Sequence, residues 1–275
     1  MKEQIKQARQ WIQESDAVLI TAGAGMGVDS GLPDFRGKEG FWNAYPIAKK
    51  LDLGFEDMAN PRWFSTNPKL AWAFYGHRLN LYRKTVPHEG FQLLLDLVKH
   101  KHEEYFIFTS NVDGQFQKSG FDAKKIYEVH GSIHHFQCAN NCKDDIWEAD
   151  QEDIEIDMEK FEALTIPQCK NCGGIARPNI LMFGDWHWNA RRSEEQNYQF
   201  NAWLQSITEA HKKLAIIEIG AGTAVPTVRI TGENIAKAYD NAKLIRINPR
   251  DYEIDRKLGF SIPYGGLEGL KQNLQ

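Results

Sequence analysis

The chain has 275 residues, of which 42% are hydrophobic and 25% charged, with a formal net charge of −4 at pH 7. This composition is typical of a globular protein and excludes a disordered chain. The small negative charge gives no indication of nucleic-acid binding, and no apolar run is long enough to span a bilayer. The first residues also lack the apolar core of a signal peptide, so we expect a cytoplasmic protein with no nucleic-acid or membrane partner.

Apolar runs without polar alternation predict buried parallel strands, and amphipathic runs between them predict helices. An opening helix is predicted to end near Glu14. The predicted strands are residues 17–21, 105–109, 126–129, 214–220 and 243–248. This order predicts an α/β fold with a doubly wound, Rossmann-like parallel sheet.

Two stretches interrupt the α/β pattern. Residues 37–87 are rich in aromatic side chains and predict a helical module, whereas residues 133–182 contain all four cysteines and an acidic stretch. We expect these two insertions to pack together as a small domain. The large domain is then expected to consist of residues 1–36, 88–132 and 183–275.

The four cysteines fall in two close pairs. They are Cys138 with Cys142 and Cys169 with Cys172, separated by three and two residues. In a cytoplasmic protein such pairs indicate a metal site rather than disulfides. Four thiolates form a closed tetrahedral site, so we expect one structural zinc ion. Four reduced cysteines without metal are the alternative. His134 and His135 lie nearby, but four thiolates already complete the site.

A glycine-rich turn follows the first predicted strand. Gly23, Gly25 and Gly27 let the backbone approach a pyrophosphate, and the helix expected after them offers unpaired N–H groups. Taken alone, this pattern fits an ordinary glycine-rich turn equally well. A second polar cluster, with Asn111 and Asp113, follows the next predicted strand, at the sheet edge where such folds bind ligands.

The motifs, in their order along the chain, resemble those of the sirtuin family of NAD-dependent protein-lysine deacylases. The run GAGMGVDSGLPDFRG at 23–37 is similar to the sirtuin signature, except that Gly27 replaces a serine and Leu32 an isoleucine. The segments TSNVDG at 109–114 and VHGS at 129–132 are similar to the family's asparagine–aspartate and histidine–glycine motifs. The chain is therefore identified as a bacterial-type sirtuin with a zinc module, whose larger domain binds NAD.

The resemblance implies roles for individual residues. It assigns His130 as the general base, a role that suits a side chain titrating near neutral pH, and it makes Asn111 and Asp113 catalytic on the nicotinamide side. Ser110 replaces a glutamine of the family and is too short to reach the nicotinamide ribose directly. The residues implied to bind NAD are Gly23, Ala24, Gly25, Asp34, Phe35, Arg36, Ser110, Asn111, Asp113, Gly222, Thr223 and Asn248.

The expected reaction is removal of an acyl group from a lysine of a protein or peptide, with release of nicotinamide and O-acyl-ADP-ribose. NAD hydrolysis or ADP-ribosyl transfer at the same site is an alternative, and Gly27 and Ser110 favour it because they alter the ribose side. A non-catalytic NAD-binding module is the third hypothesis, and the presence of His130 argues against it. The sequence leaves the protein substrate, the acyl preference and the oligomeric state open.

One segment resembles the part of sirtuins that pairs with the substrate backbone between the domains. It runs from residue 177 to 185, and the residues assigned to the substrate are Ile180, Phe183, Gly184 and Asp185. Asp185 replaces a glutamate of the family. The aromatic residues that follow at 186–188 either reshape the groove or form a packing cluster.

Tyr75 and Arg78 lie three residues apart and share one face of a predicted helix. They resemble the pair that binds the carboxylate of a succinyl or malonyl group in the desuccinylase branch of sirtuins, and both are chemically suited to bind an anion. The alternative is a stacked tyrosine–arginine pair on an amphipathic helix.

Overall fold

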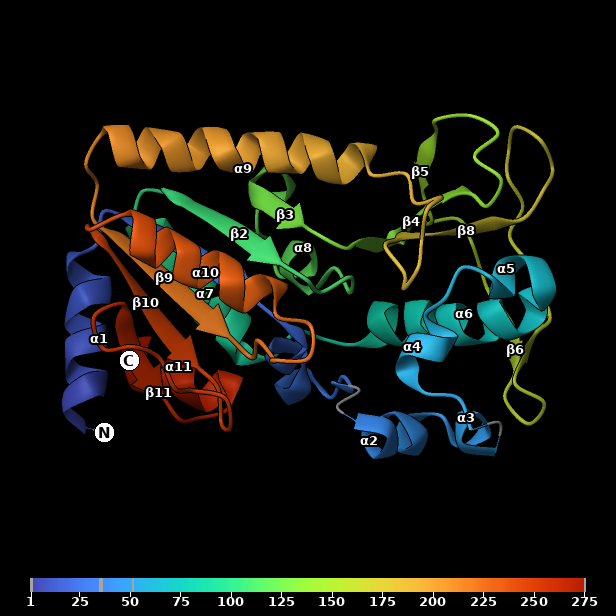
Figure 1. The fold of residues 1–275 in the computed structure, drawn as a ribbon, viewed down its shortest axis with the longest axis horizontal. Helices are drawn as coiled ribbons and strands as arrows, with labels where there is room; N and C mark the ends of the chain where they lie inside the picture. Colours follow the sequence, from blue (N-terminus) through green and yellow to red (C-terminus); the bar gives the residue numbers. More distant parts are fainter. Residues whose placement is uncertain (1, 35–36, 51, 275) are drawn as a thin grey trace.

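A computed structural model describes residues 2–34, 37–50 and 52–274. Its centre is a six-stranded sheet in the order β11-β10-β9-β1-β2-β3, and each neighbouring pair is parallel (Figure 1). The strands are β1 (Ala17–Ala22), β2 (Tyr105–Thr109), β3 (Ile126–Glu128), β9 (Leu214–Ile219), β10 (Ala242–Ile247) and β11 (Gly259–Ile262). The predicted α/β fold with a doubly wound sheet is confirmed.

Helices cover both faces of this sheet, which explains why its strands lack polar alternation. All six residues of β1 are buried. Val18 and Ile20 belong to the core under α1 (Lys2–Glu14), α7 (Glu89–His100) and α11 (Gly266–Leu274). Ala17 and Leu19 face the opposite core, under α9 (Arg191–Glu209) and α10 (Thr227–Ala238). Alternate residues of one strand therefore enter two separate cores.

The two insertions lie side by side, beyond the sheet (Figure 1). The first contains α2 (Gly37–Ala44), α3 (Pro46–Lys50), α4 (Phe55–Met58), α5 (Trp63–Thr66) and α6 (Pro68–Lys84). The second forms an antiparallel sheet in the order β5-β4-β8, with β4 (Gly131–Cys138), β5 (Ile146–Glu148) and β8 (Ala176–Ile180), and a hairpin of β6 (Ile156–Asp157) and β7 (Glu162–Ala163).

One hydrophobic core joins the two insertions. Trp72 of α6 packs against Phe136 of β4, with ring centroids 5.0 Å apart. The Trp72 indole N–H also donates to the backbone oxygen of Ala176 in β8, at 2.9 Å. Packing thus connects segments about 60 residues or more apart in sequence. The proposed division into domains at residues 36/37, 87/88, 132/133 and 182/183 stays a prediction.

The sequence predicted the position of the element after the glycine turn but not its type. It is a short 3₁₀ helix, η1 (Ala24–Ser30), which ends at Gly31 in a left-handed conformation with φ 85°. Two more short elements, α8 (Gln115–Lys118) and η2 (Ala123–Lys125), follow β2. Within the described ranges, no helix has both the length and the apolar character that crossing a membrane requires.

Candidate active site

The turns after β1 and β9 meet backbone to backbone at the carboxyl edge of the sheet. The amide of Gly25 donates to the oxygen of Gly220 at 3.0 Å. A Cβ on Gly25 would lie 2.6 Å from the Cα of Gly220, and Gly220 itself has φ +63°. A Cβ on Gly23 would likewise lie 2.8 Å from the Cα of Ala221. These glycines are therefore required by a contact within the protein, whatever ligand the turn binds.

The turn after β2 is attached to the glycine turn by hydrogen bonds. The Thr109 hydroxyl donates to the oxygen of Ala22 at 2.9 Å and accepts the amide of Asn111 at 3.0 Å. The Asn111 side chain donates to the oxygen of Gly23, also at 3.0 Å. The structure thus brings together the glycine turn and the segment of Ser110 and Asn111, which the sequence assigned to one NAD site.

Asp113 lies in the same turn and is buried. Its carboxylate accepts the backbone N–H of Gln115, the first residue of α8, at 2.9 Å. Burial raises the pKa of Asp113 to about 6, with a further upward contribution from Glu128, while the Gln115 N–H and the Arg78 charge act in the opposite direction. A carboxylate placed in this way changes its charge close to neutral pH.

His130 lies between the Asn111 turn and the end of β8. Its ring forms a hydrogen bond with the backbone of Ser110, and its backbone oxygen accepts the amide of Leu181 at 2.9 Å. Burial lowers the pKa of His130, and the bond to Ser110 opposes that shift. The imidazole is therefore neutral at neutral pH, as a general base must be.

The segment assigned to the substrate follows β8, which is one of the two edge strands of its three-stranded sheet. Ile180 is the last residue of that strand. The amide of Phe183 donates to the oxygen of Ala59 at 2.9 Å, and the Phe183 side chain is partly exposed. Gly184 turns the chain with φ +66°. The segment is thus fixed on one side by the helical insertion.

The Asp185 side chain binds other groups of the protein and is not free for a substrate. Its side chain is fully buried and forms an ion pair with the buried Arg177 of β8. One arm of this pair, Arg177 Nη1 to Asp185 Oδ1, measures 3.0 Å. The same carboxylate accepts the amide of Met182 at 3.3 Å. Any contact of residue 185 with a substrate would therefore use its backbone. Trp186 is 93% exposed, so it does not belong to a packing cluster.

Tyr75 and Arg78 are both buried in the core of the helical insertion. The Arg78 guanidinium lies 5.7 Å from the centre of the Tyr75 ring, and its Nε donates to the Tyr82 hydroxyl at 3.1 Å. Burial raises the pKa of Tyr75 to about 12. The Tyr75 hydroxyl is buried and has no hydrogen-bond partner among the described residues. A buried orphan hydroxyl beside a cation fits a ligand oxygen.

The residues assigned to the adenosine side form a less uniform group. Asn248 is buried, and its side chain donates to Ala221 O at 2.9 Å and accepts the amide of Arg250 at 3.0 Å, so it shapes the turns on either side. A Cβ on Gly222 would meet no atom of the described residues within 4 Å, and Thr223 is exposed. Ala24 begins η1, and Asp34 lies 3.7 Å from Arg250. Phe35 and Arg36 fall outside the described residues.

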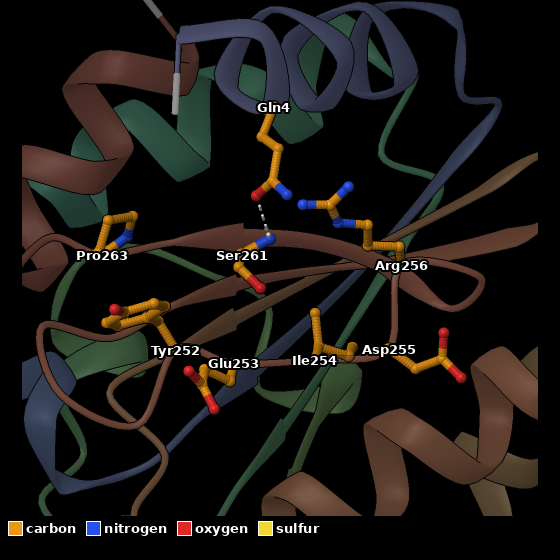
Figure 2. A pocket seen from close by; sticks show the side chains of 8 residues that line it. All are labelled: Gln4, Tyr252, Glu253, Ile254, Asp255, Arg256, Ser261 and Pro263. Atoms are coloured by element: carbon orange, nitrogen blue, oxygen red, sulfur yellow. Dashed lines mark hydrogen bonds between the residues drawn. The ribbon is translucent and has the colours of Figure 1, made fainter.

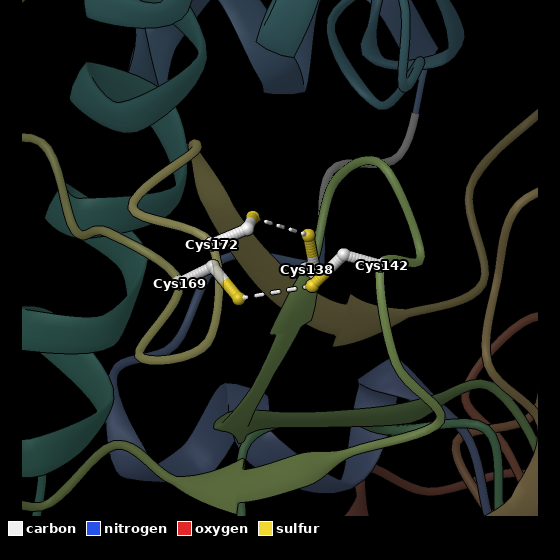
Figure 3. A group of neighbouring side chains, drawn as sticks. All are labelled: Cys138, Cys142, Cys169 and Cys172. Carbon is white, nitrogen blue, oxygen red and sulfur yellow. Dashed lines mark hydrogen bonds between the residues drawn. The ribbon is translucent and has the colours of Figure 1, made fainter.

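The four cysteines converge at the end of β4 (Figure 3). Their sulfur atoms all lie within 4.8 Å of one another. The distance from Cys138 to Cys172 is 3.7 Å and that from Cys142 to Cys169 is 3.6 Å. Tetrahedral zinc with Zn–S bonds of about 2.3 Å separates its sulfurs by about 3.8 Å. The thiol set therefore fits one structural zinc ion and leaves no coordination position for substrate.

A groove of about 660 Å³ lies beside the edge strand β11, away from these residues (Figure 2). The side chain of Gln4, from α1, reaches across it and accepts the amide of Ser261 at 3.2 Å. None of the described residues assigned to catalysis, NAD or substrate lines this groove. It is therefore no part of the candidate site.

Comparison with known proteins identifies the family of the chain. Residues 23–224 match the model of the Sir2 family, and the chain belongs to this family. An NAD-dependent protein deacylase of Leptospira interrogans is 32% identical over 249 residues, which are 90% of this chain and 87% of the relative. A probable bifunctional ADP-ribose hydrolase/ADP-ribosyltransferase of Fusarium oxysporum is 29% identical over 258 residues, 87% of this chain and 41% of the relative.

A solved structure described as a Sir2 homolog–NAD complex has a TM-score of 0.72 and 21% sequence identity, and covers 98% of this chain and 92% of its own. At this identity the likeness shows the fold. Together with the family match, it confirms the resemblance to sirtuins that the motifs indicated.

Proposed function

We propose that this chain is an NAD-dependent protein-lysine deacylase with His130 as its general base. The observation that carries the proposal is the convergence of three segments at one edge of the sheet. Asn111 donates to the glycine turn at Gly23, and the His130 ring contacts the Ser110 backbone. The deacylase name of the Leptospira relative and the NAD complex of the structural neighbour support it.

When bound, NAD supplies an activated ribose carbon as the acceptor of the acyl oxygen, with nicotinamide as the leaving group. His130 is neutral at neutral pH and can take a proton from a ribose hydroxyl. Asn111 and the carboxyl group of Asp113 hold the nicotinamide end beside it. Above about pH 6 the Asp113 carboxylate is charged, which suits it to accept hydrogen bonds from a carboxamide.

The proposed substrate is an acylated lysine in an extended peptide. Edge strands bind such peptides by backbone hydrogen bonds, and β8 is an edge strand that leads directly to the His130 contact at Leu181. We assign the peptide to the segment from Ile180 to Gly184, with its acyl-lysine directed toward His130. The Asp185–Arg177 ion pair then keeps this segment in place.

We further propose that carboxylated acyl groups, succinyl or malonyl, are accepted beside acetyl. The orphan hydroxyl of Tyr75 and the nearby guanidinium of Arg78 are the supporting observation. Arg78→Met should reduce desuccinylation more than deacetylation. Arg83→Met is the matched control. It also removes an arginine from α6, but one whose side chain donates to backbone oxygens of the protein, those of Glu152 and Ala149. Equal loss on both substrates in Arg78→Met would contradict the proposal.

ADP-ribosyl transfer or NAD hydrolysis is the second candidate. It is favoured by Ser110, which is too short for the contact that the family's glutamine makes, and by the name of the Fusarium relative. The two candidates are separated by incubating the protein with NAD, with and without an acyl-lysine peptide, and identifying the products by mass spectrometry. Deacylation yields O-acyl-ADP-ribose only with peptide, whereas free ADP-ribose without peptide marks the alternative.

A further inference from the structure

His134 lies on β4, four residues after His130, and contacts the turn that carries Asn111 and Asp113. Its Nε2 lies 2.9 Å from the backbone oxygen of Asp113. Because a carbonyl oxygen only accepts hydrogen bonds, Nε2 carries the proton and donates it. The preceding residue, Ile133, donates its amide to the oxygen of Val112 at 3.0 Å. Two successive residues of β4 therefore hold two successive carbonyl groups of the turn.

The His134 ring also packs on the residue that follows Asp113. Gly114 has φ +69°, and a Cβ there would lie 2.7 Å from His134 Cδ2. The ring thus occupies the space beside the left-handed residue, while its Nε2 holds the oxygen of the peptide group that joins Asp113 to Gly114. The Asp113 carboxylate accepts the amide of Gln115, which lies on the far side of this peptide group. The orientation of the peptide group therefore determines where the carboxylate lies.

The contact borders an open space rather than a sealed core. A cavity of about 1040 Å³ is lined by Asp113, Gly114, Ser132 and His134, among others. Loss of the imidazole would therefore widen a space that water can enter, instead of leaving a dry void in a core. The expected consequence is a looser turn in a protein that stays folded.

We propose that His134 is a positioning residue, which fixes the Asp113–Gly114 peptide and so keeps Asp113 and Asn111 in register with the nicotinamide end of NAD. The inference rests on the proposed function. His134 acts through the backbone oxygen of Asp113 and not by touching NAD. The sequence alone had set His134 aside as one of two histidines near the zinc site.

The test compares His134→Leu, which removes the donor, with His134→Gln, whose amide can donate from nearly the same place as Nε2. The control is His135→Leu, the next residue of β4, whose buried Nδ1 has no hydrogen-bond partner among the described residues. We expect His134→Leu to lower kcat/KM for NAD about tenfold, the effect of one lost hydrogen bond, with KM for the peptide unchanged. His134→Gln and His135→Leu should stay within about threefold of wild type.

The proposal is wrong if His134→Leu stays within about twofold of wild type, or if the three variants lose activity in proportion to a fall in thermal midpoint. Amide hydrogen exchange of residues 110–116, measured without NAD, separates this inference from the proposed function. Exchange should be faster in His134→Leu than in wild type and restored in His134→Gln. Exchange unchanged in His134→Leu would overturn the role of His134, whereas a wild-type protein that does not turn over NAD would refute only the deacylase.

Discussion

Substitution of Asp185 by asparagine is the sharpest test of how the substrate segment is held. The change keeps the size of the side chain but removes the charge that neutralises Arg177. The Arg177 side chain is 1% exposed and that of Asp185 is 0% exposed, so the remaining cation would be buried without its counter-ion. Breaking such a pair costs about 3–5 kcal/mol. Folded proteins have a total stability of about 5–15 kcal/mol, so the loss should be large.

Urea unfolding followed by tryptophan fluorescence measures this loss. The Asp185→Asn midpoint should fall by about 1 M or more, whereas Glu195→Gln should change it little, since the Arg191–Glu195 pair has both side chains more than half exposed. Arg177→Met combined with Asp185→Asn should be less destabilised than Asp185→Asn alone, because no buried charge is left. A loss of less than about 1 kcal/mol of unfolding free energy in Asp185→Asn would refute the reasoning, and so would a double variant whose loss equals the sum of the losses of the two single variants.

Three further predictions concern metal, pH and backbone packing. Folded protein should contain one zinc ion per chain by atomic emission, and strong chelation should lower its thermal midpoint; folded protein without zinc would contradict the Cys138–Cys172 site. Nicotinamide release should decline as pH falls through about 6, because the raised pKa of Asp113 lets its carboxylate take up a proton there; a flat rate from pH 5 to 8 would contradict this. Gly25→Ala should cost about 1–3 kcal/mol of stability in thermal unfolding, because its Cβ meets the Gly220 backbone. Gly222→Ala should cost little, because its Cβ would have no atom within 4 Å in the part of the chain that the structure describes.

The positions of most strands in the large sheet were predictable because these strands are continuous apolar runs. Strands β1, β2, β9 and β10 lie within one residue of the predicted ranges at each end, since burial on both faces imposes that pattern. β11 was not predicted, because Gly259 and Ser261 interrupt its short apolar run. The sheet of β4 and β8 was not predicted either; polar residues such as His134 and Asn179 lie within these strands and are satisfied by tertiary contacts.

The four-cysteine site was predictable because a local motif carries its chemistry. The cysteine spacing predicted a four-thiol cluster, and the cysteines do converge. What no local pattern shows is which residue far along the chain a group contacts. Gly25 packs on Gly220, almost 200 residues later. Asp185 pairs with Arg177, which is only eight residues earlier, but the burial of this ion pair depends on tertiary packing and is not visible in the local sequence. The sequence assigns Gly25 and Asp185 to ligand binding, whereas the structure shows that each also makes a contact within the protein.

The most direct test of the account is a crystal structure of this protein with NAD bound. We expect NAD across the turns after β1, β2 and β9, with a ribose hydroxyl within hydrogen-bond distance of the His130 ring and the nicotinamide end beside Asn111 and Asp113. NAD bound elsewhere, for example in the groove at Gln4 and Ser261, or a ribose out of reach of His130, would contradict the proposed enzyme.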